Sequence, residues 1–175
     1  SVGPDGATHQ ALEDIAITRA LPNMTVLAPC DKVEAVKVTA AAAKIKGPVY
    51  MRFARSKTPV FTTGKTNFKI GQAEIFKQGE DVTIIGCGPL VYEALKAAEE
   101  LRKKKISAEV INCHTIKPID QNTIIKSAKK TGKVVTIEEH QIHGGLGSAV
   151  AEVLVQNYPV PMRIIGMPDS FGESG

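Results

Sequence analysis

The chain has 175 residues, 43% of them hydrophobic and 23% charged, with a net charge of +4. This composition excludes collagen-like, disulfide-scaffold and strongly disordered chains, and the 22 Lys and Arg against 18 Asp and Glu are too few to indicate a nucleic-acid partner. No apolar run approaches the ~20 residues of a membrane-spanning helix, so no membrane partner is expected. Cys30, Cys87 and Cys113 are widely and irregularly spaced, which predicts buried thiols in a cytoplasmic protein.

The first 60 residues predict only part of a domain. Helices are expected at 11–21 and 31–46, and strands at 24–28 and 49–53. Asp31 with Glu34 three residues later resembles a capping box at the start of the second helix. Residues 58–67 show neither helical nor strand periodicity and contain Pro59 and Gly64, so they predict a linker between two domains.

Beyond residue 67 strands and helices alternate again. Strands are expected at 81–86, 108–113, 133–137 and 163–166, and helices at 89–105, 120–130 and 147–157. Such alternation is typical of a mainly parallel sheet with helices on both faces. The sequence therefore predicts an α/β protein whose second part is a doubly wound domain.

A glycine-containing turn follows the first strand of this second part. Residues 86–91 (GCGPLV) resemble the start of the G-x-G-x-x-G dinucleotide motif, but Val91 stands where the third glycine is needed. A nucleotide site is the alternative here. The tight turn alone explains the glycines, so the turn is favoured.

A second candidate site lies at residues 138–148 (EEHQIHGGLGS). His140 and His143, beside Glu138 and Glu139, are residue types that bind metals. The glycines that follow make the backbone irregular, so helical i, i+3 geometry is not expected. A structural or interface loop that ends a strand and starts a helix is favoured over a metal site.

Two further segments carry side chains that could meet a substrate. Residues 3–10 (GPDGATHQ) place Asp5 and His9 in a glycine-containing loop, and histidine can exchange a proton near neutral pH. Arg52 and Arg55 lie at the end of a predicted strand, on opposite faces if the chain is extended. Arg55 suits an anion or phosphate clamp. The alternative for residues 3–10 is a turn with a helix cap, and the alternative for Arg55 is a surface ion pair.

Taken in chain order, these motifs resemble the transketolase family. The resemblance rests on residues 3–10, 21–26 (LPNMTV), Arg55, 114–120 (HTIKPID) and 138–147. It implies that 1–60 are the carboxyl-terminal part of a pyrimidine-binding domain, which is incomplete here, and that 68–175 are a transketolase carboxyl-terminal domain without its last segment. The chain is most similar to the small subunit of a split transketolase, and both of its ends are expected to be truncated.

The resemblance also implies a reaction. Transketolases of the pentose phosphate pathway use thiamine diphosphate to move a two-carbon ketol unit from a ketose phosphate to an aldose phosphate. Asp5 would contact a substrate hydroxyl, and His9 would bind the donor and act as a catalytic residue in proton transfer. Arg55 would hold the substrate phosphate.

No residue of this chain is assigned to the cofactor or to its metal. In the family, the catalytic glutamate and the residues around the aminopyrimidine ring precede the equivalent of Gly3, and another domain holds the diphosphate and a divalent metal such as magnesium. The chain alone is therefore expected to be inactive. Its expected partners are sugar phosphates and an amino-terminal transketolase domain or subunit, in a homodimer or heterotetramer.

Three alternatives stay open on the sequence. The first two are a fragment of 1-deoxyxylulose-5-phosphate synthase and a fragment of a 2-oxoacid dehydrogenase beta subunit, because the second-domain motifs are shared with these enzymes. Residues 5–10 (DGATHQ) fit transketolase better than either. The third is a non-catalytic interaction module with the same fold.

Overall fold

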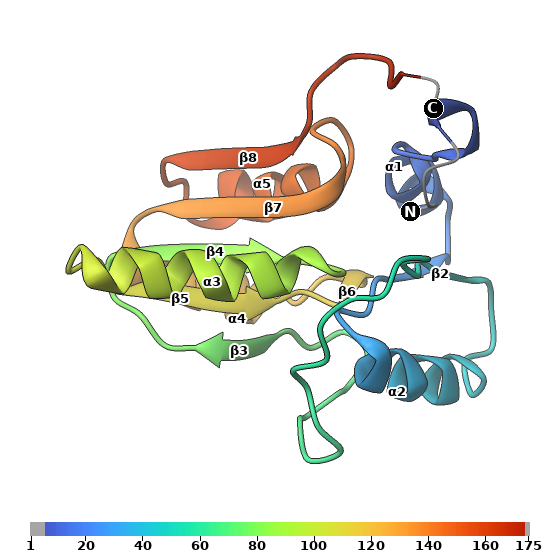
Figure 1. Ribbon diagram of the computed structural model, residues 1–175, viewed down its shortest axis with the longest axis horizontal. Coiled ribbons are helices and arrows are strands. Elements are labelled where there is room, and N and C mark those ends of the chain that lie inside the picture. Colours follow the sequence, from blue (N-terminus) through green and yellow to red (C-terminus); the bar gives the residue numbers. More distant parts are fainter. Residues whose placement is uncertain (1–5, 174–175) are drawn as a thin grey trace.

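The computed structural model describes residues 6–173, with the exception of the Thr8 side chain, and contains two β-sheets and their covering helices (Figure 1). Its elements are, in chain order, η1 (Ala7–His9), α1 (Asp14–Ala20), β1 (Thr25–Leu27), α2 (Lys32–Ala42), β2 (Val49–Met51), β3 (Glu74–Lys77), β4 (Val82–Gly86), α3 (Leu90–Lys103), β5 (Ala108–Asn112), β6 (Thr115–Lys117), α4 (Gln121–Thr131), β7 (Val134–Gln141), α5 (Leu146–Asn157) and β8 (Met162–Met167). No helix within this range is long and apolar enough to cross a membrane.

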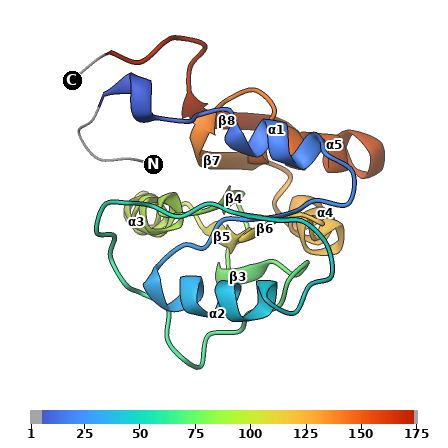
Figure 2. The ribbon, with the colours of Figure 1, turned by 90° about the vertical axis from the view of Figure 1, so that its right-hand side faces the viewer.

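The smaller sheet has the strand order β2-β1-β6. β1 is parallel to β2 and antiparallel to β6, with Val26 opposite Tyr50 and Lys117. Helices α1 and α2 lie on opposite sides of this sheet (Figure 2). A strand from the second half of the sequence therefore completes a sheet that the first half begins.

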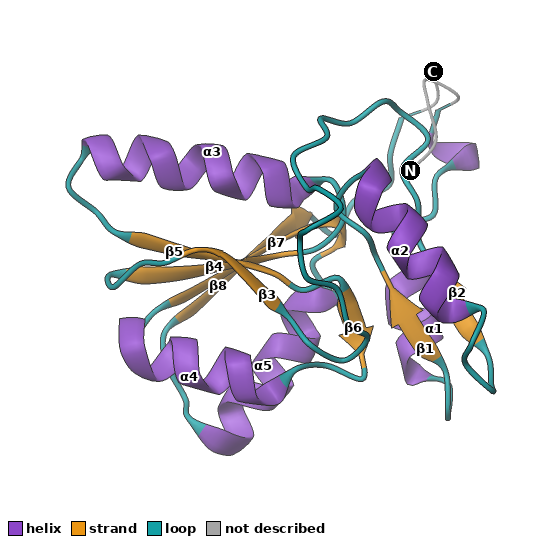
Figure 3. Cartoon of the chain, turned by 90° about the horizontal axis from the view of Figure 1, so that it is seen from below, coloured by secondary structure: helices purple, strands orange, loops and turns teal. Residues whose placement is uncertain are grey.

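The larger sheet has the order β3-β5-β4-β7-β8. β5, β4, β7 and β8 are parallel, and β3 is antiparallel at one edge. Helix α3 covers one face, and α4 and α5 cover the other (Figure 3). The chain changes direction between β4 and β7, the arrangement that defines a doubly wound sheet.

One hydrophobic cluster joins the two sheets. It includes Ile15 and Val26 from the first half and Ile85, Ile111 and Val150 from the second. Burial of such side chains contributes about 25 cal/mol per Å² of apolar surface, so this cluster stabilises the two halves against each other. Smaller clusters lie between α3 and the larger sheet, and around α2.

The predicted α/β class with a doubly wound, mainly parallel second part is confirmed, and so are the three buried thiols. Each predicted helix and strand is present, with bounds shifted by a few residues. The prediction missed β3 and β6, and it ended β7 at residue 137 although that strand continues to Gln141. Residues 58–67 have no helix or strand and run along α2, where Lys37 Nζ donates to the carbonyls of Thr63 and Thr66.

Candidate functional site

The 3₁₀ turn η1 and the carboxyl end of β2 meet at one edge of the smaller sheet. Between them lies a cavity of about 300 Å³. Its lining residues come from both segments: His9, Ala11, Asp14, Tyr50, Met51, Arg52 and Phe53. The carboxyl ends of parallel strands are where α/β proteins place ligands, so this cavity is the first candidate site.

A buried ion pair forms one wall of this cavity. Tyr50 lies in β2 and Arg52 follows the strand directly, and both side chains reach the same carboxylate. The Tyr50 hydroxyl donates to Asp14 Oδ2 at 2.7 Å, and Arg52 Nε donates to the same oxygen at 2.9 Å. Arg52 also lies 3.5 Å from the Glu139 carboxylate of β7. Burial and the adjacent Asp14 carboxylate raise the pKa of Tyr50 to about 12, so the phenol is neutral at physiological pH.

A second cavity, of about 410 Å³, adjoins the first. Phe53 lines both cavities. The lining of the second combines apolar side chains such as Val60 and Pro89 with the cationic Lys32 and Lys57. Arg55 lies between Ala54 and Ser56, which also line this cavity, and Arg55 itself is exposed.

The structure places two of the three sequence-predicted site residues at this edge. His9 is exposed and lines the first cavity, and Arg55 is exposed beside the second. Asp5 lies outside the described residues. The sequence reasoning assigned no role to Asp14, Tyr50 or Arg52. The two-residue spacing of Tyr50 and Arg52 in the predicted strand 49–53 indicates that the two side chains share a face, but no sequence pattern identifies Asp14 as the partner.

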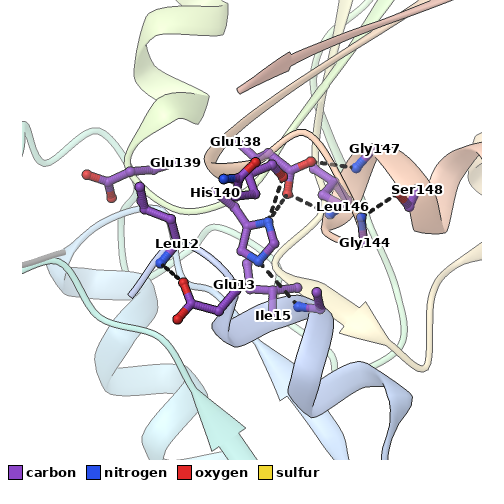
Figure 4. A network of polar contacts seen from close by, with 12 residues as sticks. Leu12, Glu13, Ile15, Glu138, Glu139, His140, Gly144, Leu146, Gly147 and Ser148 are labelled. Atoms are coloured by element: carbon purple, nitrogen blue, oxygen red, sulfur yellow. Dashed lines mark hydrogen bonds and ion pairs between the residues drawn. The ribbon is translucent and has the colours of Figure 1, made fainter. Parts of the chain in front are cut away.

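The segment from β7 to α5 lies next to the first cavity and contains a buried polar network (Figure 4). The Glu138 carboxylate accepts hydrogen bonds from the N–H groups of Leu146 and Gly147, at 2.6 and 2.7 Å, at the start of α5. Burial raises the pKa of Glu138, and these two N–H groups oppose that shift. The favoured interpretation, a loop that ends a strand and starts a helix, is confirmed here.

The crevice between the carboxyl ends of β4 and β7 is filled by the first half of the chain. The Ala16 N–H of α1 donates to His140 Nε2, and the Gly88 N–H donates to the carbonyl of Ala28, just after β1. Gly88 has φ +60°, as the tight-turn interpretation of residues 86–91 requires. Ligands of doubly wound domains bind in this crevice, and here the protein's own α1 occupies it.

Comparison with known proteins decides the family. The chain matches the family described as "Transketolase, C-terminal domain" over residues 71–175 and the family described as "Transketolase, pyrimidine binding domain" over residues 1–60. The chain belongs to the transketolase family. The resemblance stated from the sequence motifs is thereby confirmed.

Individual relatives agree with this assignment. The chain is 44% identical over 171 residues to a 6-deoxy-6-sulfo-D-fructose transketolase subunit of Clostridium sp. (strain MSTE9), covering 98% of this chain and 53% of that protein. It is 43% identical over 173 residues to a 1-deoxy-D-xylulose-5-phosphate synthase of Trichormus variabilis, covering 96% of this chain and 27% of that protein. A solved structure described as "Split gene transketolase, inactive beta4 tetramer" superposes with a TM-score of 0.93 at 46% identity, covering 95% of this chain and 56% of that one. The chain thus spans about half the length of its transketolase-subunit relatives.

Transketolase-family enzymes use thiamine diphosphate. Residues 6–173 do not fit its diphosphate and metal. At the carboxyl ends of β4 and β7, where a doubly wound domain would bind a diphosphate, Ala28 and α1 make contact instead, and within that range no three His, Cys, Asp or Glu side chains converge as metal ligands.

Proposed function

We propose that this chain supplies the substrate-contacting part of a thiamine-diphosphate-dependent transketolase, which moves a two-carbon ketol unit from a ketose phosphate to an aldose phosphate. One observation carries the proposal: His9 lines one cavity, the neighbours of Arg55 line a second, and the two cavities adjoin at Phe53. In this proposal 1–60 belong to a pyrimidine-binding domain and 68–175 form the carboxyl-terminal domain.

The proposed roles follow from the chemistry of each side chain. His9 faces an open cavity, where an imidazole can bind the donor sugar and exchange a proton near neutral pH. Arg55 offers a guanidinium fork that matches the oxygens of a phosphate. Arg52 is less suited to that role because its side chain is buried, whereas Arg55 is exposed. Asp5 is proposed to contact a substrate hydroxyl.

The remaining machinery is proposed to come from an amino-terminal transketolase domain or subunit, in a homodimer or heterotetramer. That partner would bind thiamine diphosphate and a divalent metal such as magnesium. The solved relative described as an inactive beta4 tetramer supports a subunit that does not turn over alone. We place the assembled enzyme in the cytoplasm and in the pentose phosphate pathway.

The test is to reconstitute the enzyme. The chain is mixed with an amino-terminal transketolase subunit, thiamine diphosphate and magnesium, and cleavage of xylulose 5-phosphate is measured. Arg55→Met should raise the KM for the sugar phosphate about 10- to 100-fold, because a charge-assisted hydrogen bond contributes about 1.5–3 kcal/mol. His9→Ala should lower kcat by about 100-fold, at the lower end of general acid–base contributions. Arg163→Met, an exposed arginine on β8, is the matched control and should change neither value.

Other outcomes assign the chain elsewhere. Consumption of pyruvate without cleavage of the sugar phosphate would favour a 1-deoxyxylulose-5-phosphate synthase or a 2-oxoacid dehydrogenase beta subunit. The 43% identity to a 1-deoxy-D-xylulose-5-phosphate synthase makes the first of these the second candidate. A stable complex without any activity would indicate a non-catalytic interaction module.

A further inference from the structure

The segment that carries His9 is held in place by the second half of the chain. The Gln141 N–H of β7 donates to the Leu12 carbonyl at 2.8 Å, three residues after His9. Arg19 Nη1 donates to the Gly144 carbonyl at 3.1 Å. On the other side of η1, the Ala7 N–H donates to the carbonyl of Glu173 at 3.1 Å. Residues 10–13 have no helix or strand of their own, so these contacts define the path of the segment.

His140 lies at the centre of this attachment. Its side chain is fully buried, its Nε2 accepts from the Ala16 N–H at 3.3 Å, and its Nδ1 lies 2.7 Å from the Gln141 carbonyl. Because Nε2 accepts, Nδ1 carries the proton and donates to that carbonyl. The ring thus joins the end of β7 to the first turns of α1, the helix that follows His9 (Figure 4).

The packing around His140 leaves it little freedom. Glu138 Oε2 lies 3.9 Å from His140 Nδ1, and the same carboxylate is fixed by the N-terminus of α5. A Cβ on Gly145 would come within 2.1 Å of Glu138 Oε2 and 2.6 Å of His140 Nδ1. A Cβ on Gly144 would come within 2.6 Å of the Ala16 side chain. The glycines of residues 138–147 therefore allow the buried carboxylate, the imidazole and α1 to approach one another closely.

We propose that His140 is a positioning residue, through which the carboxyl-terminal domain sets the place of His9 at the substrate cavity. The domain then acts on the reaction through α1 and residues 10–13 without contacting the substrate. This inference rests on the proposed function for its catalytic consequence, while its structural part stands on the contacts themselves. It assigns a specific role to His140, which lies in a segment that the sequence predicts to be structural or an interface, with a metal site as the alternative.

The kinetic test compares three variants in the reconstituted enzyme. His140→Leu removes the acceptor for the Ala16 N–H. His140→Gln keeps an acceptor at a similar reach from the backbone. His143→Leu changes an exposed histidine of the same loop and is the matched control. We expect His140→Leu to lower kcat/KM for the donor sugar phosphate about 10- to 100-fold, the effect of a small misplacement of catalytic groups, with the Kd for thiamine diphosphate unchanged. His140→Gln should recover most of that loss, and His143→Leu should behave as the unsubstituted chain.

Hydrogen exchange measures the same attachment without any activity. Amides of residues 10–16 should exchange at least about tenfold faster in His140→Leu, with exchange in β4 and β5 unchanged. If His140→Leu does not fold, Arg19→Met weakens the same attachment at the Gly144 carbonyl and should also speed exchange of residues 10–16. The proposal would be overturned if folded His140→Leu showed unchanged exchange of residues 10–16 or full activity. It would also be overturned if His140→Gln lost as much kcat/KM as His140→Leu. If the unsubstituted assembly shows no ketol transfer, the proposed function fails, and the exchange experiment still decides the positioning role.

Discussion

Arg52 and Arg55 are three residues apart and lie in different environments. The Arg52 side chain is 9% exposed and pairs with Asp14, which is 10% exposed. Arg55 is exposed at the rim of the second cavity. A desolvated guanidinium that is paired with a buried carboxylate stabilises the fold around it, whereas an exposed guanidinium lies where a phosphate can reach it. The same residue type therefore has a structural role at one position and a proposed binding role at the other.

This difference predicts that the same substitution has a large effect on stability at Arg52 and a small one at Arg55. Arg52→Met should lower the free energy of unfolding by about 3 kcal/mol, because it leaves the Asp14 carboxylate buried without its cationic partner. Arg55→Met should leave stability nearly unchanged, as is usual for exposed positions. Urea unfolding of the two variants measures both effects. Equal losses of stability would contradict the assignment of Arg52 to the fold.

At the scale of elements, Asp31 links α2 to the segment 58–67. Its Oδ1 caps the helix by accepting from the Glu34 N–H at 3.0 Å, and its Oδ2 accepts from the N–H groups of Phe61 and Thr62 at 2.9 and 2.7 Å. Burial raises the pKa of Asp31, but the hydrogen bonds from Glu34, Thr62 and Phe61 outweigh it and leave the pKa below its usual range. One carboxylate thus organises both a helix start and a loop beside the second cavity.

Asp31→Asn should separate the capping of α2 from the attachment of residues 58–67. Asparagine is a good N-cap, so α2 should remain, but its NH₂ group would meet the two loop N–H donors. We expect faster proteolysis within residues 58–67 and a loss of stability of about 1–3 kcal/mol. Because the folded pKa lies below the unfolded one, the contribution of Asp31 is present above about pH 4 and is lost as the pH falls through its folded pKa. The variant should lack this part of the acid dependence in urea unfolding. Proteolysis within residues 58–67 at the same rate as in the unsubstituted chain would contradict the role of Asp31 in holding this segment.

The sequence predicted those elements whose pattern is local. The helices α3 and α4 carry their own periodicity and, in α4, an Asp120 cap that accepts from the Thr123 N–H. β3 and β6 escaped prediction because antiparallel pairing with β5 and β1 defines these short strands.

The candidate site divides in the same way. His9 and Arg55 stand in motifs that the sequence displays, so they could be named from it. The contact of His140 with Ala16 joins residues 124 positions apart, and that of Arg52 with Asp14 spans 38. The first contact arises from the packing of the two halves and the second from the packing of α1 beside the end of β2, and no local pattern identifies either partner.

At the scale of the whole molecule, the two halves share a sheet, a hydrophobic cluster and the His140 attachment. The crevice of the doubly wound part is consequently used for contact within the chain. Two cavities lie at the edge of the smaller sheet, beside the segments that carry His9 and Arg55. Within residues 6–173 no metal-ligand cluster stands beside these cavities, which supports the proposal that a second surface completes the site.

Measuring the binding of thiamine diphosphate tests whether the chain alone can hold the cofactor. Isothermal titration of thiamine diphosphate with magnesium into the chain alone should show no binding at micromolar concentrations, since the described residues hold no converging metal ligands and their switch-point crevice is filled. Adding the amino-terminal transketolase subunit should create binding that exceeds that of either component, because the ligand then stabilises the assembled state. Arg55→Met is the control: in the assembly it should leave the binding of thiamine diphosphate unchanged while weakening the binding of the sugar phosphate. Micromolar binding by the chain alone would show that it holds the cofactor without a partner and would contradict the division of the site between two surfaces.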